Sequence, residues 1–331
     1  MSTEFQLSKR RLVTGAALSL LGGALVSPFA HAAGFPDKPL RIVVPFGAGG
    51  VADLTARTVA QHMSQTLGQP VVIDNKPGAG GVVASDLVAK AAPDGYTLLL
   101  MSNASAVSAG LFKSLPYDTL RDFAPVSVLG TFDIAIVVPA NSPFKSLPEM
   151  LAFARANPGK LNIGSINIGS SQHLTAELFK SQAAIDVQIV PFNGTPAVVT
   201  ALRGGQVDAA VEILSPVLPQ IQAKALRVLA VTSAQRSPAL PDAPTAKESG
   251  LPDLLASSWN ALAAPAKTPA PVIARLNQAA VAALQNPEVR QKLQALNVQA
   301  QPGTPEQASQ LLASEVKRWG DVIVRAKIEK Q

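Results

Sequence analysis

One stretch of the chain, RIVVPFGAGGVAD at residues 41–53, has residue types and spacing that could bind an anion. An apolar strand runs into a glycine turn and then into a helix, and glycine lets the backbone come close to a bound group. Gly47, Gly49 and Ala52 fit the G-x-G-x-x-[G/A] pattern of dinucleotide sites, and Asp74 lies where an acid would hold a ribose. The stretch is therefore consistent with a nucleotide site or with a simple anion site at a helix N-terminus.

A serine–histidine pair is the other candidate for chemistry, because hydrolysis needs a nucleophile beside a base. Beyond residue 32 the chain has His62 and His173 and no cysteine. Ser170 or Ser171 could pair with His173, but the G-x-S-x-G elbow and an obvious third member are absent. Two histidines without H-x-x-x-H spacing do not suggest a zinc site. The sequence therefore predicts no catalytic residue, no metal, no cofactor and no enzyme activity.

An export signal is predicted over residues 1–32. A basic run at 9–11 precedes an uncharged apolar run at 12–26, and Ala30 and Ala32 have the spacing that a signal peptidase requires. The cut is expected after Ala32, and the mature protein is expected in the periplasm. The basic run fits the twin-arginine route only loosely, so the Sec and twin-arginine routes both remain open.

A nucleotide is the less favoured ligand for the glycine turn. Soluble redox cofactors are scarce outside the cytoplasm, and Pro45-Phe46 separates the strand from the first glycine. The Walker pattern also fails, because neither GAGG segment is followed by Lys-Ser or Lys-Thr. An NAD-dependent oxidoreductase is therefore kept only as an alternative to a binding protein.

The charge of the chain argues against a nucleic-acid partner. The whole sequence has 28 basic and 22 acidic residues, and removing Lys9, Arg10, Arg11 and Glu4 of the signal leaves 25 and 21. The resulting charge of +4 is scattered, without a basic run or interleaved aromatic residues.

Apolar runs alternate with helical patterns along the mature chain, which predicts an α/β protein with mainly parallel strands. The first series has strands at 40–46, 70–75 and 96–102 and helices at 53–68 and 80–95. The second has strands at 133–139, 161–166, 187–192, 206–213 and 225–232 and helices at 146–159, 171–183 and 195–205. A proline-rich segment at 237–253 is followed by a strand at 258–265 and two helices, at 269–293 and 305–326. Two domains facing one another across a cleft are expected.

The sequence resembles the Bug family, the extracytoplasmic solute-binding proteins of tripartite tricarboxylate transporters. The resemblance covers nearly the whole mature chain in the right order. The motifs that carry it are FPDKPLRIVVPFGAGGVADLTAR, GQPVVIDNKPGAGG, AAPDGYTLLL, LPYD, RDFAPV, GSINIGSSQHLTAELF, VPFNGTPA, LRGGQVDAAVE, LRVLAVTS, LPDAPTAKESG and APAKTP.

The resemblance implies a two-lobed type II periplasmic binding-protein fold with two interlobe crossings, near Thr131 and Ser258. Lobe one would comprise 34–131 plus 258–331, and lobe two 132–257. The lobes would close on a small organic carboxylate and present it to the membrane subunits of a tripartite tricarboxylate transporter. A monomer is expected. A related alternative is a sensing protein that presents the carboxylate to the periplasmic domain of a signalling receptor.

The resemblance also implies where the solute lies: between loops at helix N-termini of both lobes, held largely by backbone N–H groups. In lobe one these are Phe46, Gly47, Ala48, Gly49, Gly50, Val51 and Ala52, with Ser102, Asn103 and Ala104. In lobe two they are Gly164, Ser165, Gly169, Ser170, Ser171, His173, Phe192, Asn193, Gly194 and Thr195.

Three further residues have expected local roles. Thr195-Pro196 has the pattern of an N-cap followed by proline at the first helical position, so Thr195 could merely cap a surface helix. Asp53 is expected to be a structural N-cap or first-turn acid, because a second carboxylate would repel the solute. Asp208 is also expected to be structural.

Departures from the family's usual residues favour one kind of solute. Gly47 and Val51-Ala52 stand where a proline and a hydroxyl residue are common, and Phe192-Asn193 stands where Tyr-Lys is common. At both places the chain has fewer polar side-chain groups that could reach the solute. A mono- or dianionic carboxylate with a sizeable apolar or aromatic body is therefore expected in preference to citrate or a zwitterionic amino acid.

Overall fold

The computed structural model describes residues 34–331, so the predicted export signal lies outside the described residues. Residues 36–331 form one compact unit. Within residues 34–331, no helix combines the length and the apolar character needed to cross a membrane.

A first sheet is built around β1, LRIVV, whose four apolar side chains are buried while Arg41 is half-buried. The strand order is β2-β1-β3-β9-β4, and β10 pairs with the far side of β4. β1, β2 and β3 are parallel, whereas β9 is antiparallel to both of its neighbours. The strands are β1 (Leu40–Val44), β2 (Val71–Asn75), β3 (Thr97–Ser102), β4 (Phe123–Pro139), β9 (Ser257–Pro265) and β10 (Val298–Ala300).

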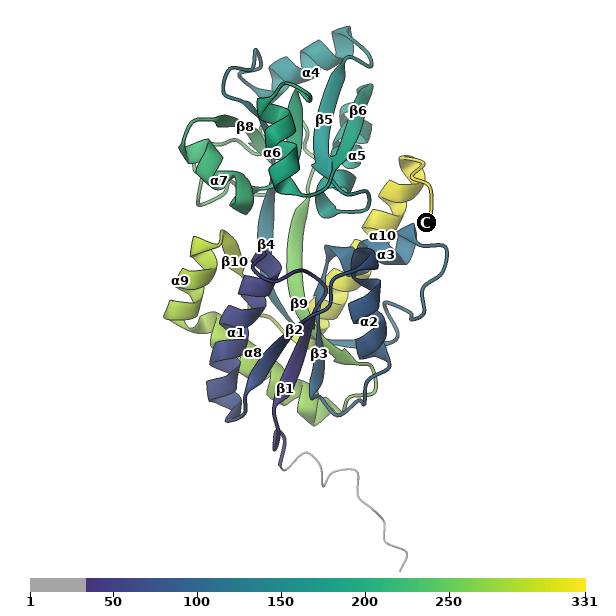
Figure 1. Ribbon diagram of the computed structural model, residues 1–331, viewed down its shortest axis with the longest axis vertical. Helices are drawn as coiled ribbons and strands as arrows, with labels where there is room; N and C mark the ends of the chain where they lie inside the picture. The colour runs from purple at the N-terminus through teal and green to yellow at the C-terminus, as the bar shows by residue number, and fades with distance from the viewer. Residues whose placement is uncertain (1–33) are drawn as a thin grey trace, which may run out of the picture. The chain divides into compact units, whose positions relative to one another are not determined.

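Helices cover this sheet in two groups (Figure 1). One group is α1 (Val51–Leu67), α8 (Ala270–Gln285) and α9 (Pro287–Ala295). The other is α2 (Val82–Ala89), which follows the short turn η1 (Ala79–Gly81), with α3 (Asn103–Leu111) and α10 (Pro305–Arg325).

The second half of β4 belongs to a second sheet, in which it is antiparallel to β7 and β8 while β5 is parallel to β6 and β7. The strands are β5 (Leu161–Ile166), β6 (Val187–Phe192), β7 (Ala209–Ile213) and β8 (Leu226–Val231). The helices are α4 (Leu147–Ala156), α5 (Ser171–Ala183), α6 (Thr195–Arg203) and α7 (Leu214–Gln222).

The chain passes between the sheets at two adjacent points. β4 pairs with β9 as far as Asp133, and from Ile134 onward it pairs with β7 and β8. The return lies beside it, because Thr232 N–H donates to Ile134 O at 2.8 Å and Ala256 N–H donates to Thr232 O at 2.8 Å. Both points fall within a few residues of the expected crossings. The lobe boundaries themselves stay a prediction, since residues 36–331 divide no further.

One apolar core runs through both sheets and fixes the loops between them. Trp259 of β9, Trp319 of α10 and Phe179 of α5 are fully or almost fully buried in the same cluster. Trp319 Nε1 donates to Glu315 Oε2 at 2.7 Å, which satisfies the indole inside the core. Burial of this size stabilises a fold that has no disulfide.

The structure corrects several expected elements: the strand expected at 133–139 begins at Phe123, and β10 was not predicted. α3 and α7 were not predicted, because α3 is rich in serine and small residues and α7 contains Pro216 and Pro219. The helix expected at 269–293 is two helices, and Asn286 ends the first and caps the second by accepting from Glu288 N–H at 2.9 Å. The predicted α/β class with parallel strands joined by helices is confirmed.

Candidate functional site

A cavity of about 860 Å³ lies among turns from both sheets. Its walls come from the turn after β1, the η1 turn, α3, the β5–α5 loop, the β6–α6 loop and Gln331, so residues as far apart in the sequence as Pro45 and Gln331 meet around it. Six of the sequence-predicted residues line it: Phe46, Ala104, Gly169, Ser170, Phe192 and Asn193. No acidic or basic side chain is among its lining residues.

The rest of the first glycine turn, Gly47 to Ala52, does not line this cavity. Gly50 is the N-cap of α1 and no side chain caps the helix. Gly49 has a positive φ of 83°, and its N–H donates to Asp53 Oδ2 at 2.8 Å. One of the amides expected to face the solute is therefore occupied inside the protein.

Asp53 lies in the first turn of α1 and holds the turn together. Besides Gly49 N–H, its carboxylate accepts from Arg57 Nε at 2.9 Å and from Asn75 Nδ2 at 2.8 Å. Burial pushes the pKa of Asp53 up, but the hydrogen bonds from Arg57, Gly49 and Asn75 and the charge of Arg57 outweigh it and leave the pKa below its ordinary value. The carboxylate is thus ionised and internally paired.

The second predicted segment of the first sheet starts α3. Ser102 Oγ accepts from Ala104 N–H at 3.2 Å, and Ser105 completes a capping box by accepting from Ser102 N–H at 3.3 Å. Asn103 Nδ2 donates to Ser257 O at 3.0 Å, which ties the helix to β9. Ser102 and Asn103 therefore hold α3 in place, and Ala104 is the residue that reaches the cavity.

The β5–α5 loop is also capped by its own side chain. Ser170 Oγ accepts from His173 N–H at 3.0 Å and donates to Ile166 O at 3.2 Å. Ser171 Oγ lies 3.3 Å from Ser258 Oγ, which links α5 to β9. Gly169 has a φ of 82°, and a Cβ on it would clash with Leu111 Cδ2 of α3. The absence of a side chain at Gly169 therefore lets the β5–α5 loop approach the C-terminal end of α3.

His173, Gly164 and Ser165 lie behind this loop and do not line the cavity. The His173 ring is buried, and burial lowers its pKa to about 4, so the ring is neutral at physiological pH. Its Nδ1 has no hydrogen-bond partner among the described residues and its Nε2 lies 4.0 Å from Glu177 Oε1, so neither ring nitrogen is bonded to Ser170 or Ser171. Gly164 packs beneath α6, where a Cβ would lie 3.2 Å from Val207.

The β6–α6 loop ends differently from the prediction. Gly194, with a φ of 91°, is the N-cap of α6, and no side chain caps the helix. Thr195 is the first helical residue, so the expectation that it is the N-cap is wrong. Its Oγ1 instead donates to Glu212 Oε2 at 2.9 Å.

Glu212 was not identified from the sequence. This β7 residue is fully buried and lies beside the first turns of two helices, because its Oε2 also accepts from Gln172 Nε2 of α5 at 3.3 Å. Its Oε1 has no partner. Burial raises the pKa of Glu212 to about 7, although the hydrogen bonds from the side chains of Thr195 and Gln172 and from the Ile213 backbone oppose the rise. The available signal was an acid inside an otherwise apolar strand, AAVEI.

A second glycine turn was also missed as part of the site. Gly78, Gly80 and Gly81 line the cavity opposite the β6–α6 loop and all have positive φ. Gly81 is the N-cap of α2, again without a side-chain cap, and Ser108 Oγ of α3 fixes the turn by donating to Gly80 O at 3.1 Å. The signal was the second GAGG segment, which belongs to the motif GQPVVIDNKPGAGG.

The remaining structural prediction concerns Asp208, which lies on the surface away from the cavity lining. Its Oδ2 accepts from Asn162 N–H at 2.9 Å and so links the start of β7 to β5.

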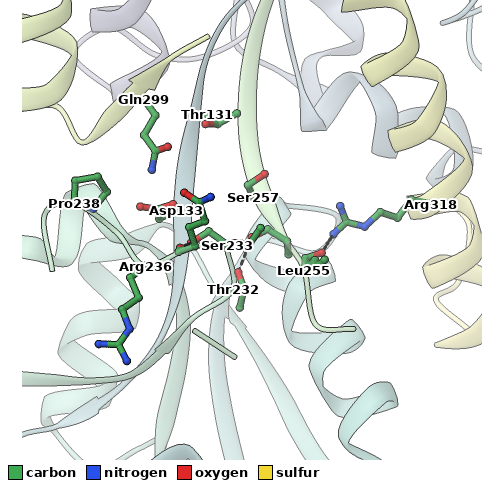
Figure 2. A pocket seen from close by; sticks show the side chains of 13 residues that line it. Thr131, Asp133, Thr232, Ser233, Arg236, Pro238, Leu255, Ser257, Gln299 and Arg318 are labelled. Carbon is green, nitrogen blue, oxygen red and sulfur yellow. Dashed lines mark hydrogen bonds between the residues drawn. The ribbon is translucent and has the colours of Figure 1, made fainter. Parts of the chain in front are cut away.

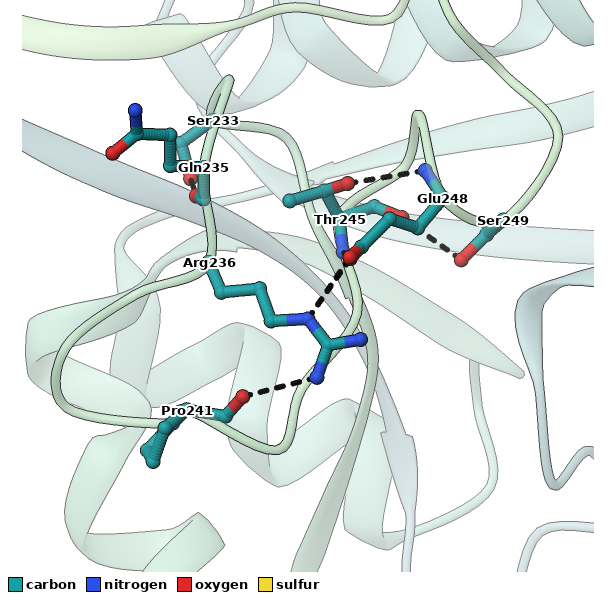
Figure 3. Close-up of polar contacts among 7 residues, drawn as sticks. All are labelled: Ser233, Gln235, Arg236, Pro241, Thr245, Glu248 and Ser249. Atoms are coloured by element: carbon teal, nitrogen blue, oxygen red, sulfur yellow. Dashed lines mark hydrogen bonds and ion pairs between the residues drawn. The ribbon is translucent and has the colours of Figure 1, made fainter.

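A second cavity, of about 320 Å³, lies beside the two crossing segments and contains none of the predicted site residues (Figure 2). Asp133 is buried there with Oδ2 unpaired, near Ser257 and Gln299. Arg236 at its edge is held by Glu248 at 3.0 Å and by Pro241 O at 3.1 Å (Figure 3). These contacts join Arg236 to residues of the proline-rich segment that follows it.

The arrangement suits an anion rather than a reaction. α1, α2 and α6 begin at glycines without side-chain caps, and helix N-termini attract negative charge. α3 and α5 are satisfied by Ser102 and Ser170. Among residues 34–331, no group of three or more histidine or acidic side chains could hold a metal.

Comparison with known proteins agrees with this geometry. Residues 55–328 match the TctC family, which is described as the tripartite tricarboxylate transporter family receptor. The chain belongs to this family. Protein BugT of Bordetella pertussis is 37% identical over 291 residues, covering 87% of this chain and 89% of that protein.

Two solved structures of TctC-like proteins carry carboxylates. Rpa4515 of R. palustris with adipate is 32% identical, has a TM-score of 0.79 and matches 89% of this chain and 99% of its own. MatC (Rpa3494) from Rhodopseudomonas palustris with bound malate is 34% identical, has a TM-score of 0.75 and matches 87% and 100%. The expected Bug-family membership and two-lobed periplasmic binding-protein fold are confirmed. Proteins of this TctC and Bug family are periplasmic solute-binding proteins.

Replacing Gly169 by alanine should destabilise the fold by disturbing the contact between the β5–α5 loop and α3. An alanine with this positive φ would cost about 1–2 kcal/mol of stability, and its Cβ would also displace the Leu111 side chain. The matched control is Gly205→Ala, which has a φ of 70° and open space around its Cβ. Urea unfolding should show a larger loss for Gly169→Ala than for the control, and equal losses would show that Leu111 does not restrict the loop.

Replacing Glu212 by glutamine should raise stability at pH 8 more than at pH 4.5. The folded pKa of about 7 lies above the ordinary pKa of a glutamate, 4.5, so the wild type loses stability as pH rises between these values, whereas the glutamine variant loses none. The difference corresponds to about 3 kcal/mol between pH 4.5 and pH 8. Urea unfolding measures it, with the exposed Glu329→Gln as control. An equal effect of Glu212→Gln at both pH values would contradict the claim that ionised Glu212 destabilises the folded protein.

Proposed function

We propose that this protein binds a small organic carboxylate by lobe closure and delivers it to the membrane subunits of a tripartite tricarboxylate transporter. The observation that carries the proposal is a cavity without acidic or basic side chains that is bordered by glycine-capped helix starts, at Gly81 and beside Gly194. Backbone N–H groups and helix dipoles there would neutralise the carboxylate, as the family resemblance implies.

The energies are adequate for such a site. A hydrogen bond to a charged group contributes about 1.5–3 kcal/mol, so four or five of them at the middle of this range, about 9–11 kcal/mol, exceed the roughly 8 kcal/mol of a micromolar complex. The surplus offsets the loss of motion of the solute and the ordering of the loops. Of the twenty residues named from the sequence, the proposed contacts are the six that line the cavity, with Gly78, Gly80 and Gly81 added.

The walls of the cavity favour a solute with an apolar body. Phe46, Val107, Leu111, Phe112 and Phe192 line it, whereas Ser108, Asn167, Ser170 and Asn193 supply few polar side chains. A linear or aromatic dicarboxylate fits these walls better than citrate. The relatives with adipate and malate support the dicarboxylate class.

Closure of the lobes is expected because the cavity walls come from segments of both sheets. Ala104 and Gly81 belong to segments of the first sheet, and Ser170 and Asn193 to loops of the second. Contacts from both sides are complete only when the loops meet, so the solute favours the closed form. The closed form is then the species that the membrane subunits recognise.

The solute class is tested by a thermal-shift screen of adipate, malate, citrate and aromatic acids, followed by titration calorimetry. We expect binding of a dicarboxylate, and Asn193→Asp should weaken it at least tenfold because a like charge is added at the cavity wall. Asn141→Asp, on an exposed turn, is the matched control. Micromolar citrate with no other acid would reject the preference for an apolar body, and equal affinities of the two variants would place the solute elsewhere.

Delivery is tested separately, in a strain that lacks this gene. Loss of uptake of the labelled solute supports transport. Normal uptake with lost induction of the solute's catabolic genes would instead favour the sensing alternative.

A further inference from the structure

We infer that Glu212 sets the charge accepted at the α5–α6 end of the site, so that a solute carboxylate binds there together with one proton on Glu212. This inference rests on the proposed function and adds a specificity-determining residue to it.

The hydrogen bonds around Glu212 leave room for that proton. The two side-chain donors, Thr195 Oγ1 and Gln172 Nε2, approach Oε2, while Oε1 is buried and accepts from no side chain. A protonated carboxyl carries its hydrogen on one oxygen and accepts on the other. A proton on Oε1 would therefore preserve both observed contacts.

The position of Glu212 links it to the proposed anion site. Thr195, its partner, directly follows Gly194, the uncapped start of α6, and Asn193 lines the cavity. A solute carboxylate at these amides would lie close to Glu212, whose own carboxyl is fully buried. Two carboxylates so placed cannot both be ionised without a large cost.

No other charged group on the surrounding elements is bonded to Glu212. The elements packed against β7 are β4, β5, α5, α6 and α7. Their titratable side chains are Asp133 of β4, His173, Glu177 and Lys180 of α5, and Arg203 of α6. Among these, the His173 ring is neutral above about pH 4 because burial lowers its pKa, and Arg203 lies in the last turn of α6, away from Thr195.

The free protein holds this proton only in part near neutral pH, because burial places the pKa of Glu212 at about 7. Binding of a carboxylate would raise that pKa further. Proton uptake on binding should therefore be small below pH 6 and should approach one proton per solute at pH 8, where affinity falls by up to tenfold per pH unit.

The test is titration calorimetry of the full chain with adipate and with malate at pH 6, 7 and 8, in phosphate and in Tris, whose ionisation enthalpies differ. The wild type should take up close to one proton at pH 8. Glu212→Gln, whose amide oxygen can accept from both donors, should take up none and should bind with an affinity independent of pH. Gln172→Met removes a donor that opposes the rise in pKa and should move the pH dependence to higher pH.

Asp133→Asn is the control, since Asp133 lies on the same strand as Ala135, the β4 partner of Glu212. It should leave the proton uptake unchanged. Binding without proton uptake, or uptake that persists in Glu212→Gln, would overturn this inference and leave the proposed function standing. Failure of adipate, malate and every other acid in the screen to bind would overturn both.

Discussion

The first N–H groups of a helix have no partner within that helix, and the site depends on which helices leave them free. Where a serine precedes the helix, as at Ser102 and Ser170, the side chain takes one of these groups. Where a glycine precedes it, as at Gly50, Gly81 and Gly194, no side chain does so. The chain thus separates helix starts that are closed internally from helix starts that can receive an anion, and it does so without placing a cation in the cavity.

The core makes this arrangement durable. α10 packs against α3 and α5. The apolar cluster that contains Trp319 and Phe179 therefore joins helices of the first sheet to a helix of the second. Gly169 fits against Leu111 only because it has no side chain, and the bridge between Ser171 and Ser258 ties the same loop to β9. Loops that would otherwise be mobile are therefore held by buried contacts within a few residues of the cavity.

The sequence was sufficient for the fold class and for six of the residues that line the cavity, because apolar strands followed by glycine turns are local signals. Phe46, Gly169 and Asn193 could be named since each lies in a motif. Asn103–Leu111 could not be recognised as a helix, because its capping box uses Ser102 and Ser105 rather than an acid. Glu212 could not be placed, because its environment depends on Thr195 and Gln172, which are distant along the chain, and on complete burial. The occupied amide of Gly49 was missed for a similar reason, since nothing local shows that Asp53 turns back to accept from it.

A crystal structure of the protein with adipate tests the central claim most directly. The account predicts a carboxylate between the η1 turn and the β6–α6 loop, with its oxygens about 2.7–3.2 Å from backbone N–H groups at the starts of α2 or α6. A carboxylate paired with an arginine or lysine side chain, or adipate in the cavity beside Asp133, would contradict it.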